Sequence, residues 1–495
     1  MSNPNEIKPF VFAEFDTIES STKLEDANKP TESHSAQPVA NDAEVSQIQS
    51  VEAEVDTATE EQLSNKQNIA TTGDLTPQAT TNCIPAKASQ TKSLSNEEVM
   101  EHTASLWKYI AIPESEPEPF AEYINSTESL LGSKVTAARV RGKKHKHEGT
   151  NCDDWYEVAD SRDITFIAVS DGAGSKRFSR IGAREACKAA IGYLVTTTEK
   201  LREDNSTVFS DILLELSNQQ CMNACGVLAG IIQQAVIQAH EAVETAYYSR
   251  STEEAYSNAL GRSLEFKDFS GTLLLAALIP INSDSKEHLI ITCQIGDGMI
   301  AILNSKGKFS TSLKLMGEAD SGDFSGETDF LTSSQMKTIS ALQSRTKITR
   351  VIADTVLVMT DGVSDDYFPN ETELYRLYLD LIVNGIISCA DEEFSLDSLT
   401  AEQMKIFKRI PDPLVYPWVN DQSVKIPIQY VKRISEATGL SLEKLWEDSL
   451  PIRLANIEMK SMSHIEDISE RLKIWLDNYV ERGSFDDRTL VIAQM

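Results

Sequence analysis

The chain has 495 residues, of which 76 are acidic and 46 basic, so its formal net charge at neutral pH is -30. This charge argues against general binding to nucleic acid or to anionic membranes, because their phosphates would repel it. The seven cysteines are too few for a disulfide framework, and we therefore expect reduced thiols and a location in the cytoplasm.

The first 95 residues predict a disordered, acidic tail rich in Ser and Thr, because so polar a stretch cannot bury enough surface to offset chain entropy. The sequence shows neither an N-terminal leader pattern nor a run of about 20 apolar residues, and we expect no membrane-spanning segment. Residues 96–133 are predicted to form a linker with a short helix, because prolines alternate with acids over residues 113–119. The folded domain is predicted to cover residues 134–495.

Strands and helices follow one another through this domain. Apolar, β-branched stretches predict strands at residues 135–140 and 164–169, and helical periodicity marks residues 179–195, 206–216 and 224–249. Five later stretches also predict strands: residues 273–279, 289–294, 299–303, 356–360 and 490–493. The short turns between the first three of these predict a meander within one antiparallel sheet. Residues 370–482 predict a mostly helical insertion in which we find no chemistry.

The stretch Ser170-Asp171-Gly172-Ala173-Gly174-Ser175 closes one predicted strand and precedes a helix. A glycine-rich turn at this position is typical of nucleotide sites, but Arg177 replaces the third glycine of the dinucleotide motif. A Gly-Lys-Ser/Thr ending, which a phosphate-binding P-loop requires, is also missing. An aspartate at this turn would repel phosphate unless a cation lay between them.

Other aspartates recur beside predicted strands. Asp361 and Asp486 flank strands as Asp171 does, the pair Asp153-Asp154 precedes another, and Asp297 stands between two glycines. A single acid at a strand end is usually a solvated turn residue. Several acids that meet at one end of a sheet would instead form a site of hard oxygen ligands, which favours Mg²⁺ or Mn²⁺ over Zn²⁺.

At these positions the sequence resembles the metal-dependent serine/threonine protein phosphatases of type 2C, and a bacterial branch of them in particular. The matching motifs stand in the family's order: Asp153-Asp154, Asp171-Gly172, Ser270-Gly271-Thr272, Gly296-Asp297-Gly298, Thr360-Asp361-Gly362 and Asp486-Asp487-Arg488-Thr489. The resemblance implies an α+β fold in which two antiparallel sheets pack face to face with helices outside.

The resemblance also implies the roles of the acids. Asp171 would bridge two Mn²⁺ or Mg²⁺ ions with help from the Gly172 carbonyl, and Asp361 and Asp486 would hold one of these ions. Paired cations lower the pKa of a bridging water and neutralise charge on the phosphoryl oxygens.

Further acids would complete the implied site. Asp153 or Asp154 would hold the second ion, partly through water. Asp297 and Asp365 resemble the ligands of a third, weaker metal site.

Two positions depart from many members of the family. Many members have a histidine, a candidate general acid, directly after the Asp-Gly motif, and this chain has Ala173 there. Many also have an arginine five residues before the second acid of the acidic pair, and this chain has Gly149 there. A basic run could supply the missing positive charge, although a solvated loop is an equally open interpretation: Lys144, His145, Lys146 and His147. Asp171, Asp154 and His145 are accordingly the predicted catalytic residues.

These features predict a metal-dependent phosphoprotein phosphatase that acts on phosphoserine and phosphothreonine. Its expected partners are phosphorylated proteins and a cognate Ser/Thr kinase, with no nucleic acid and no membrane. The alternative is a catalytically weak or inactive phosphatase-like protein that binds phosphoproteins. The retained acids favour the enzyme, and the two departures keep the alternative open.

Overall fold

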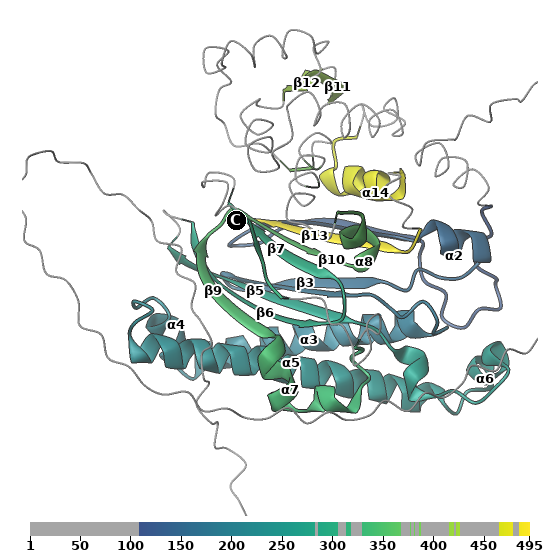
Figure 1. The fold of residues 1–495 in the computed structure, drawn as a ribbon, viewed down its shortest axis with the longest axis horizontal. Helices are drawn as coiled ribbons and strands as arrows, with labels where there is room; N and C mark the ends of the chain where they lie inside the picture. The colour runs from purple at the N-terminus through teal and green to yellow at the C-terminus, as the bar shows by residue number, and fades with distance from the viewer. Residues whose placement is uncertain are drawn as a thin grey trace, which may run out of the picture. The chain divides into compact units, whose positions relative to one another are not determined.

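The computed structural model describes residues 108–282, 286–304, 313–317, 329–367, 415–419, 422–425, 465–478 and 485–495, together with Leu377, Leu381, Ile386 and Ile387. The predictions for the tail and for most of residues 370–482 lie outside these described residues. The described part of the domain has two antiparallel sheets with helices on their outer faces (Figure 1). This confirms the predicted α+β fold.

The first sheet has six strands in this order: β1 (Tyr123–Ser129), β2 (Lys134–Val140), β13 (Arg488–Gln494), β10 (Thr355–Met359), β7 (Met299–Leu303) and β8 (Leu313–Leu315). The second has five: β3 (Trp155–Ser161), β4 (Ile164–Ser170), β5 (Leu273–Asn282), β6 (Glu287–Ile295) and β9 (Thr346–Ile352). All neighbouring strands in both sheets run antiparallel.

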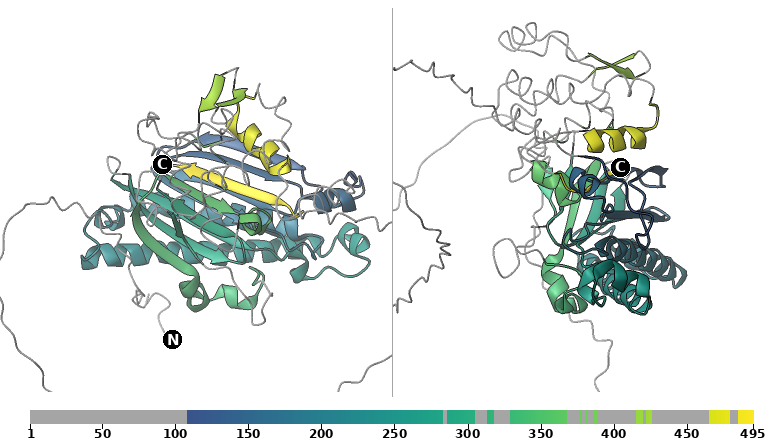
Figure 2. Two further views of the ribbon diagram at one scale, coloured as in Figure 1. Left: turned by 45° about the horizontal axis from the view of Figure 1, so that its top comes forward. Right: turned by 90° about the vertical axis from the view of Figure 1, so that its right-hand side faces the viewer.

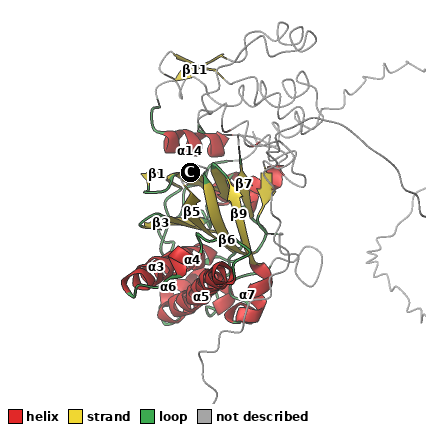
Figure 3. Cartoon of the chain, turned by 90° about the vertical axis from the view of Figure 1, so that its left-hand side faces the viewer, coloured by secondary structure: helices red, strands yellow, loops and turns green. Residues whose placement is uncertain are grey.

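The helices form two outer layers. The longest are α3 (Ser179–Glu203) and α5 (Gln219–Arg250), which pack on the second sheet, while α14 (Ile468–Asn478) packs on the first (Figures 2 and 3). Shorter helices and 3-10 turns complete the described part: α2 (Lys143–Glu148), α4 (Val208–Asp211), α6 (Glu254–Leu260), η1 (Phe266–Phe269), η3 (Ser334–Lys337), α7 (Ile339–Arg345), α8 (Asp361–Ser364) and η4 (Asp365–Tyr367).

The strands of the second sheet are apolar on both faces because each face is covered. Along β4, Phe166 and Ala168 pack among the helices, whereas Ile167 and Val169 pack between the two sheets. This alternation follows from the period of two residues in a strand. It explains why these segments have nearly continuous apolar sequences.

The predicted meander is wrong at its third strand. β5 and β6 pair in the second sheet, but β7 belongs to the first sheet, so the chain crosses between the sheets after β6. Gly296 permits this crossing: its φ is +97°, and a Cβ there would lie 2.3 Å from Thr272 Cγ2. The crossing places Asp297 between the ends of the two sheets.

The predicted domain boundary at residue 134 is too late. β1 pairs with β2 along its whole length, and the segment before it is fixed by ion pairs. Arg180 Nη2 lies 3.0 Å from Glu116 Oε1, and Arg250 Nε lies 2.7 Å from Glu118 Oε1. The prolines and acids of residues 113–119, which indicate a linker by composition, therefore belong to the folded domain.

Two described elements fall within the predicted insertion. α14 packs against β1 and β2, so the end of that region is part of the domain's outer layer. β11 (Val415–Val419) and β12 (Gln422–Lys425) pair as a hairpin.

α5 is the one helix of the described residues that is long and apolar enough to cross a membrane. Its apolar side is buried against α3 and the second sheet, as in the core helix of a globular domain, and half of the apolar window is buried. Length and composition alone do not distinguish a membrane-spanning helix from the buried core helix of a globular domain.

Candidate metal centre

Strand registers bring distant acids to one end of the two sheets. At the end of β10, Met359 pairs with Met299 on one side and with Leu490 on the other. At the end of β4, Ser170 pairs with Trp155 of β3. The acidic residues that flank these five positions therefore lie at the same end of the two sheets, although Asp154 and Asp486 are 332 residues apart in the sequence.

A cluster of carboxylates lies at this meeting point. Ligand oxygens of Asp171, Asp297 and Asp361 lie within 4.8 Å of one another, and all three side chains are partly exposed. Burial and then the neighbouring Asp297 and Asp154 raise the pKa of Asp361 to about 8. Burial, followed by Asp361 and Asp154, raises the pKa of Asp171 well above its ordinary range. Each carboxylate therefore makes its neighbours harder to ionise.

Two further acids border the cluster. Burial and then the charges of Asp297 and Asp486 raise the pKa of Asp365. Asp486 also raises the pKa values of Asp171 and Asp361. Both residues thus lie within electrostatic reach of the cluster.

Asp154 is the fully buried member of the site. Its Oδ2 accepts hydrogen bonds from the hydroxyls of Thr360 at 2.9 Å and Thr489 at 2.6 Å. Its Oδ1 has no hydrogen-bond partner among the described residues. Burial and then the charge of Asp487 raise the pKa of Asp154 to about 7. One oxygen is held in place and the other is left for a ligand.

A buried arginine fixes the backbone beside Asp154. Arg139 on β2 donates from Nη1 to the Asp154 carbonyl at 2.7 Å and from Nη2 to the Ala121 carbonyl at 3.1 Å. Its guanidinium lies 4.7 Å from the ring centre of Trp155, which is consistent with a cation–π contact. Sequence reasoning missed this residue, because only the fold brings it under the acidic pair.

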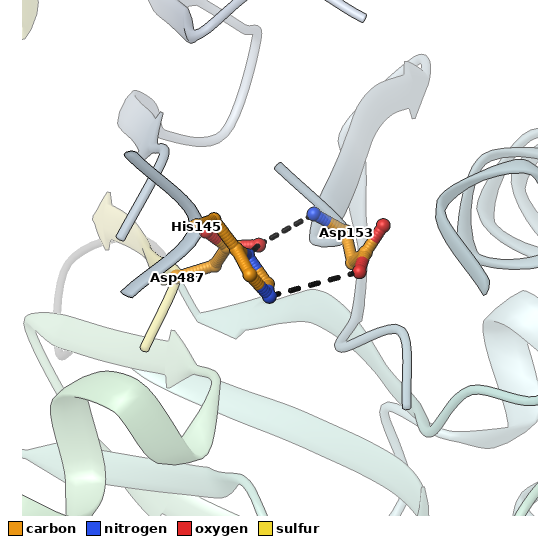
Figure 4. Close-up of side chains that lie close together, drawn as sticks. All are labelled: His145, Asp153 and Asp487. Atoms are coloured by element: carbon orange, nitrogen blue, oxygen red, sulfur yellow. Dashed lines mark hydrogen bonds and ion pairs between the residues drawn. The ribbon is translucent and has the colours of Figure 1, made fainter. Parts of the chain in front are cut away.

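Asp153 faces another partner. His145 Nε2 lies 3.9 Å from Asp153 Oδ2, and His145 Nδ1 lies 2.8 Å from Asp487 Oδ2 (Figure 4). Asp487 also accepts the backbone N–H of Gly142 at 2.6 Å and that of Asp153 at 2.5 Å. These three residues are close enough to hold a metal ion, but three N–H groups already occupy the Asp487 oxygens. We therefore interpret the group as a buried, hydrogen-bonded ion pair.

The pKa values agree with an ion pair. Burial lowers the pKa of His145, but the charge and hydrogen bond of Asp487 outweigh it and raise the pKa to about 10. Burial raises the pKa of Asp487, yet His145 and the two backbone N–H groups lower it below its ordinary value. Burial also raises the pKa of Asp153 to about 8, because His145 offsets only part of the desolvation.

The Ser270-Gly271-Thr272 motif holds the Asp171-Gly172 turn. The backbone N–H of Asp171 donates to Thr272 Oγ1 at 2.9 Å, and the N–H of Thr272 donates back to the Asp171 carbonyl at 2.8 Å. Gly172 and Gly271 form an isolated antiparallel bridge. This reciprocal pairing fixes the turn that presents the Asp171 carboxylate.

Close backbone packing joins the last two motifs. A Cβ on Gly362 would lie 1.9 Å from the Asp487 carbonyl oxygen, so only glycine fits at this position. The requirement explains the glycine of Thr360-Asp361-Gly362 without a role in catalysis.

The structure separates the predicted site residues into two groups. It brings six acids together: Asp154, Asp171, Asp297, Asp361, Asp365 and Asp486. Gly172 lies buried in the turn that carries Asp171, whereas Asp153 and His145 face Asp487. The predicted loop that contains His145 is the helix α2. The hydroxyls of Thr360 and Thr489, which orient Asp154, were part of the matched motifs, but no local signal gave them this role.

The cluster fits a divalent cation. A buried carboxylate oxygen without a donor is costly, and carboxylates that repel one another are stabilised by a shared positive charge. The donors are carboxylates, which suit hard cations such as Mg²⁺ or Mn²⁺.

A family model described as protein phosphatase 2C matches residues 141–400, which is more than half of the 495 residues. The chain is similar to a solved bacterial serine phosphatase, with 11% identity over 76% of this chain and 98% of that one, at a TM-score of 0.30. The serine/threonine phosphatase Stp1 from Staphylococcus aureus shares 12% identity over 75% of this chain and 99% of its own, at a TM-score of 0.31. The photosystem II phosphatase PBCP shares 14% identity over 74% of this chain and 99% of its own, also at a TM-score of 0.31. No curated protein matches the sequence.

Proposed function

The chain belongs to the protein phosphatase 2C family, and on this premise we propose that it hydrolyses phosphoserine and phosphothreonine in proteins at a binuclear Mn²⁺ or Mg²⁺ centre. The observation that carries the proposal is the convergence of six carboxylates, one of which leaves a buried oxygen without a hydrogen-bond donor. A cluster of this kind is costly in the absence of cations and therefore argues for a metal-binding role.

Asp171 lies at the centre of the proposed site. The charges of both Asp361 and Asp154 raise its pKa, so its carboxylate interacts with both neighbours, which supports a ligand shared by two ions. Asp361 and Asp486 would hold one ion with it, and Asp154 Oδ1 would face the other. When bound, two such cations lower the pKa of a water and neutralise charge on the phosphoryl group.

Asp297 and Asp365 would form a third, weaker site. The charge of Asp297 raises the pKa of Asp365, so each carboxylate feels the other, and the Asp365 side chain is exposed to solvent. Ala173 carries no ionisable group, so we propose that the serine or threonine leaving group takes its proton from water. His145 would not serve, because its side chain is buried and hydrogen-bonded to Asp487.

The test is phosphate release from an aryl phosphate and from a phosphopeptide, measured on the full chain with and without Mn²⁺. We expect release that depends on Mn²⁺ and that Asp171→Asn abolishes. Absence of such release in the native chain would overturn the proposal.

The second candidate function, a protein that binds phosphoproteins with little or no turnover, rests on Ala173 and Gly149. Under it, calorimetry should detect tight Mn²⁺ binding and phosphopeptide binding in the same protein that shows no phosphate release. Under the first candidate function, the cognate kinase would be the one that phosphorylates the proteins this chain dephosphorylates.

A further inference from the structure

The basic helix α2 stands beside the carboxylate cluster, and its cations have different surroundings. Lys146 Nζ pairs with Asp477 on α14 and lies 5.0 Å from the ring centre of Tyr123. His145 is paired with Asp487. Two of the four residues of the predicted basic run are thus committed to structural contacts.

Lys144 differs from these neighbours. Among the described residues its ammonium group has no carboxylate partner, and its side chain is partly exposed. The position expected for a Cβ on Gly174 lies 3.7 Å from Lys144 Nζ, and no other atom outside the adjoining residues approaches that position within 4 Å. The ammonium group therefore lies over the open turn that begins at Asp171.

The backbone of Lys144 is hydrogen-bonded to the segment that carries Asp486. Its N–H donates to the carbonyl of Phe485 at 2.9 Å, directly before Asp486. The backbone of Lys144 therefore lies next to the residue that precedes Asp486. Its ammonium group lies next to Gly174, which follows Asp171 by three residues. The backbone and the ammonium group of the lysine thus lie beside the two segments that carry Asp486 and Asp171.

Other nearby cations interact with carboxylates outside the cluster. Arg177 Nη2 lies 2.5 Å from Glu116 Oε2, and Arg180 contacts the same carboxylate. The charge of Lys176, two residues after Gly174, lowers the pKa of Asp268 on η1, a carboxylate outside the cluster. Lys144 is therefore the cation best placed for an anion at the cluster.

We propose that Lys144 binds the phosphoryl group of the substrate through its ammonium group, in place of the arginine whose position Gly149 occupies. The inference rests on the proposed function, because it requires a phosphate at the metal centre. A lysine ammonium is a point charge with three donors, and an unpaired one attracts a phosphate dianion without first breaking another ion pair. Hydrogen bonds that involve charged groups are stronger than those between neutral groups, so loss of the lysine should weaken phosphate binding about tenfold or more.

The test measures inorganic phosphate binding to the full chain loaded with Mn²⁺, by titration calorimetry. We expect Lys144→Ala to weaken phosphate binding about tenfold and Lys144→Arg to restore it to within about threefold, while Mn²⁺ affinity stays unchanged. The matched control Lys176→Ala should change phosphate affinity by less than about twofold. The effect of Lys144→Ala should also diminish at high salt, because the group is partly exposed.

A second perturbation leaves the lysine in place. Gly174→Asp would put a carboxylate within reach of Lys144 Nζ and should weaken phosphate binding, whereas Gly174→Asn should not. In the Lys144→Ala background the difference between these two substitutions should shrink, because the pair no longer forms.

The outcomes separate the inference from the proposed function. Phosphate binding that depends on Lys144 without any turnover would refute the phosphatase and retain the phosphate site. Turnover with unchanged phosphate affinity in Lys144→Ala would refute the role of Lys144. No phosphate binding by the native chain, or a larger effect of Lys176→Ala, would also overturn the inference.

Discussion

Replacing His145 with glutamine tests the buried ion pair beside the proposed metal centre. His145 Nδ1 and Asp487 Oδ2 lie 2.8 Å apart, and both side chains are almost inaccessible to solvent. His145→Gln removes the positive charge while keeping a polar side chain that can donate a hydrogen bond. Asp487 would then remain a buried carboxylate without a cationic partner.

The expected loss of stability is large. The rise of the His145 pKa from its ordinary value of about 6.5 to about 10 corresponds to about 5 kcal/mol of free energy. Removing one member of a buried ion pair costs about 3–5 kcal/mol in general, because the other charge is left uncompensated. We therefore expect a free energy of unfolding about 3–5 kcal/mol lower in the variant near pH 6.

The pH dependence follows from the direction of this shift. Below about pH 6.5 His145 is protonated in the folded and the unfolded chain, and the ion pair contributes its full stabilisation. Between about 6.5 and 10 the folded protein retains a proton that the unfolded chain has released, so the contribution falls as the pH rises. The difference in stability between the native chain and the variant should therefore shrink toward pH 10.

The measurement is urea unfolding of the full chain, followed by tryptophan fluorescence in the absence of divalent cations. His147→Gln is the matched control on the same helix, where His147 Nδ1 accepts a hydrogen bond from the Lys108 N–H at 2.9 Å. It should cost less than about 1 kcal/mol. A loss below about 1 kcal/mol for His145→Gln near pH 6, or a loss that does not change with pH, would refute the ion-pair interpretation.

Three further predictions concern the centre itself. Because the pKa of Asp154 is raised to about 7, Mn²⁺ binding near neutral pH should release protons and tighten as the pH rises; calorimetry in buffers of different ionisation enthalpy measures this, and binding without proton release would contradict it. Thr489→Val removes the 2.6 Å hydrogen bond to Asp154, and Mn²⁺ affinity should fall about 10–100-fold; an unchanged affinity would mean that the hydroxyl does not orient the ligand. Gly362→Ala forces a methyl group against the Asp487 carbonyl and should lower the free energy of unfolding by at least about 1–3 kcal/mol; an equally stable variant in urea unfolding would rule out the close packing.

The strands and the acids at their ends could be predicted from the sequence because their signals are local. β4 has an apolar run that ends at Asp171, and β10 has one that ends at Asp361, which is enough to place both carboxylates at strand ends. The crossing between sheets at Gly296 could not be predicted, because a short turn between strands has the same appearance whether the chain stays in one sheet or changes to the other.

Charge partners far apart in the sequence account for the other failures. Residues 113–119 indicate a linker by composition, but Glu118 pairs with Arg184 and Arg250, which lie 66 and 132 residues further on. Together with Tyr256, these contacts outweigh the desolvation that burial imposes and lower the pKa of Glu118 to about 2. Only the fold brings such partners together, so no local pattern could have predicted the true start of the domain.

In each of the acidic pairs Asp153-Asp154 and Asp486-Asp487, one carboxylate belongs to the cluster and the other to the buried ion pair. In the first pair Asp154 faces the cluster and Asp153 faces His145. In the second, Asp486 acts on the cluster while Asp487 accepts three N–H groups. Successive residues that lead into a strand point to opposite sides, so each pair divides its side chains between two environments.

This division has an energetic meaning. The carboxylates on the cluster side raise one another's pKa values, and that repulsion destabilises the folded chain until cations bind. On the other side, His145 and backbone N–H groups compensate the charge of Asp487 within the protein itself. A fold that needed its acids only as turn residues would gain from compensating all of them. The six acids of the cluster are thus the ones arranged for a ligand, and the compensated pair supplies the rigid support that holds them close together.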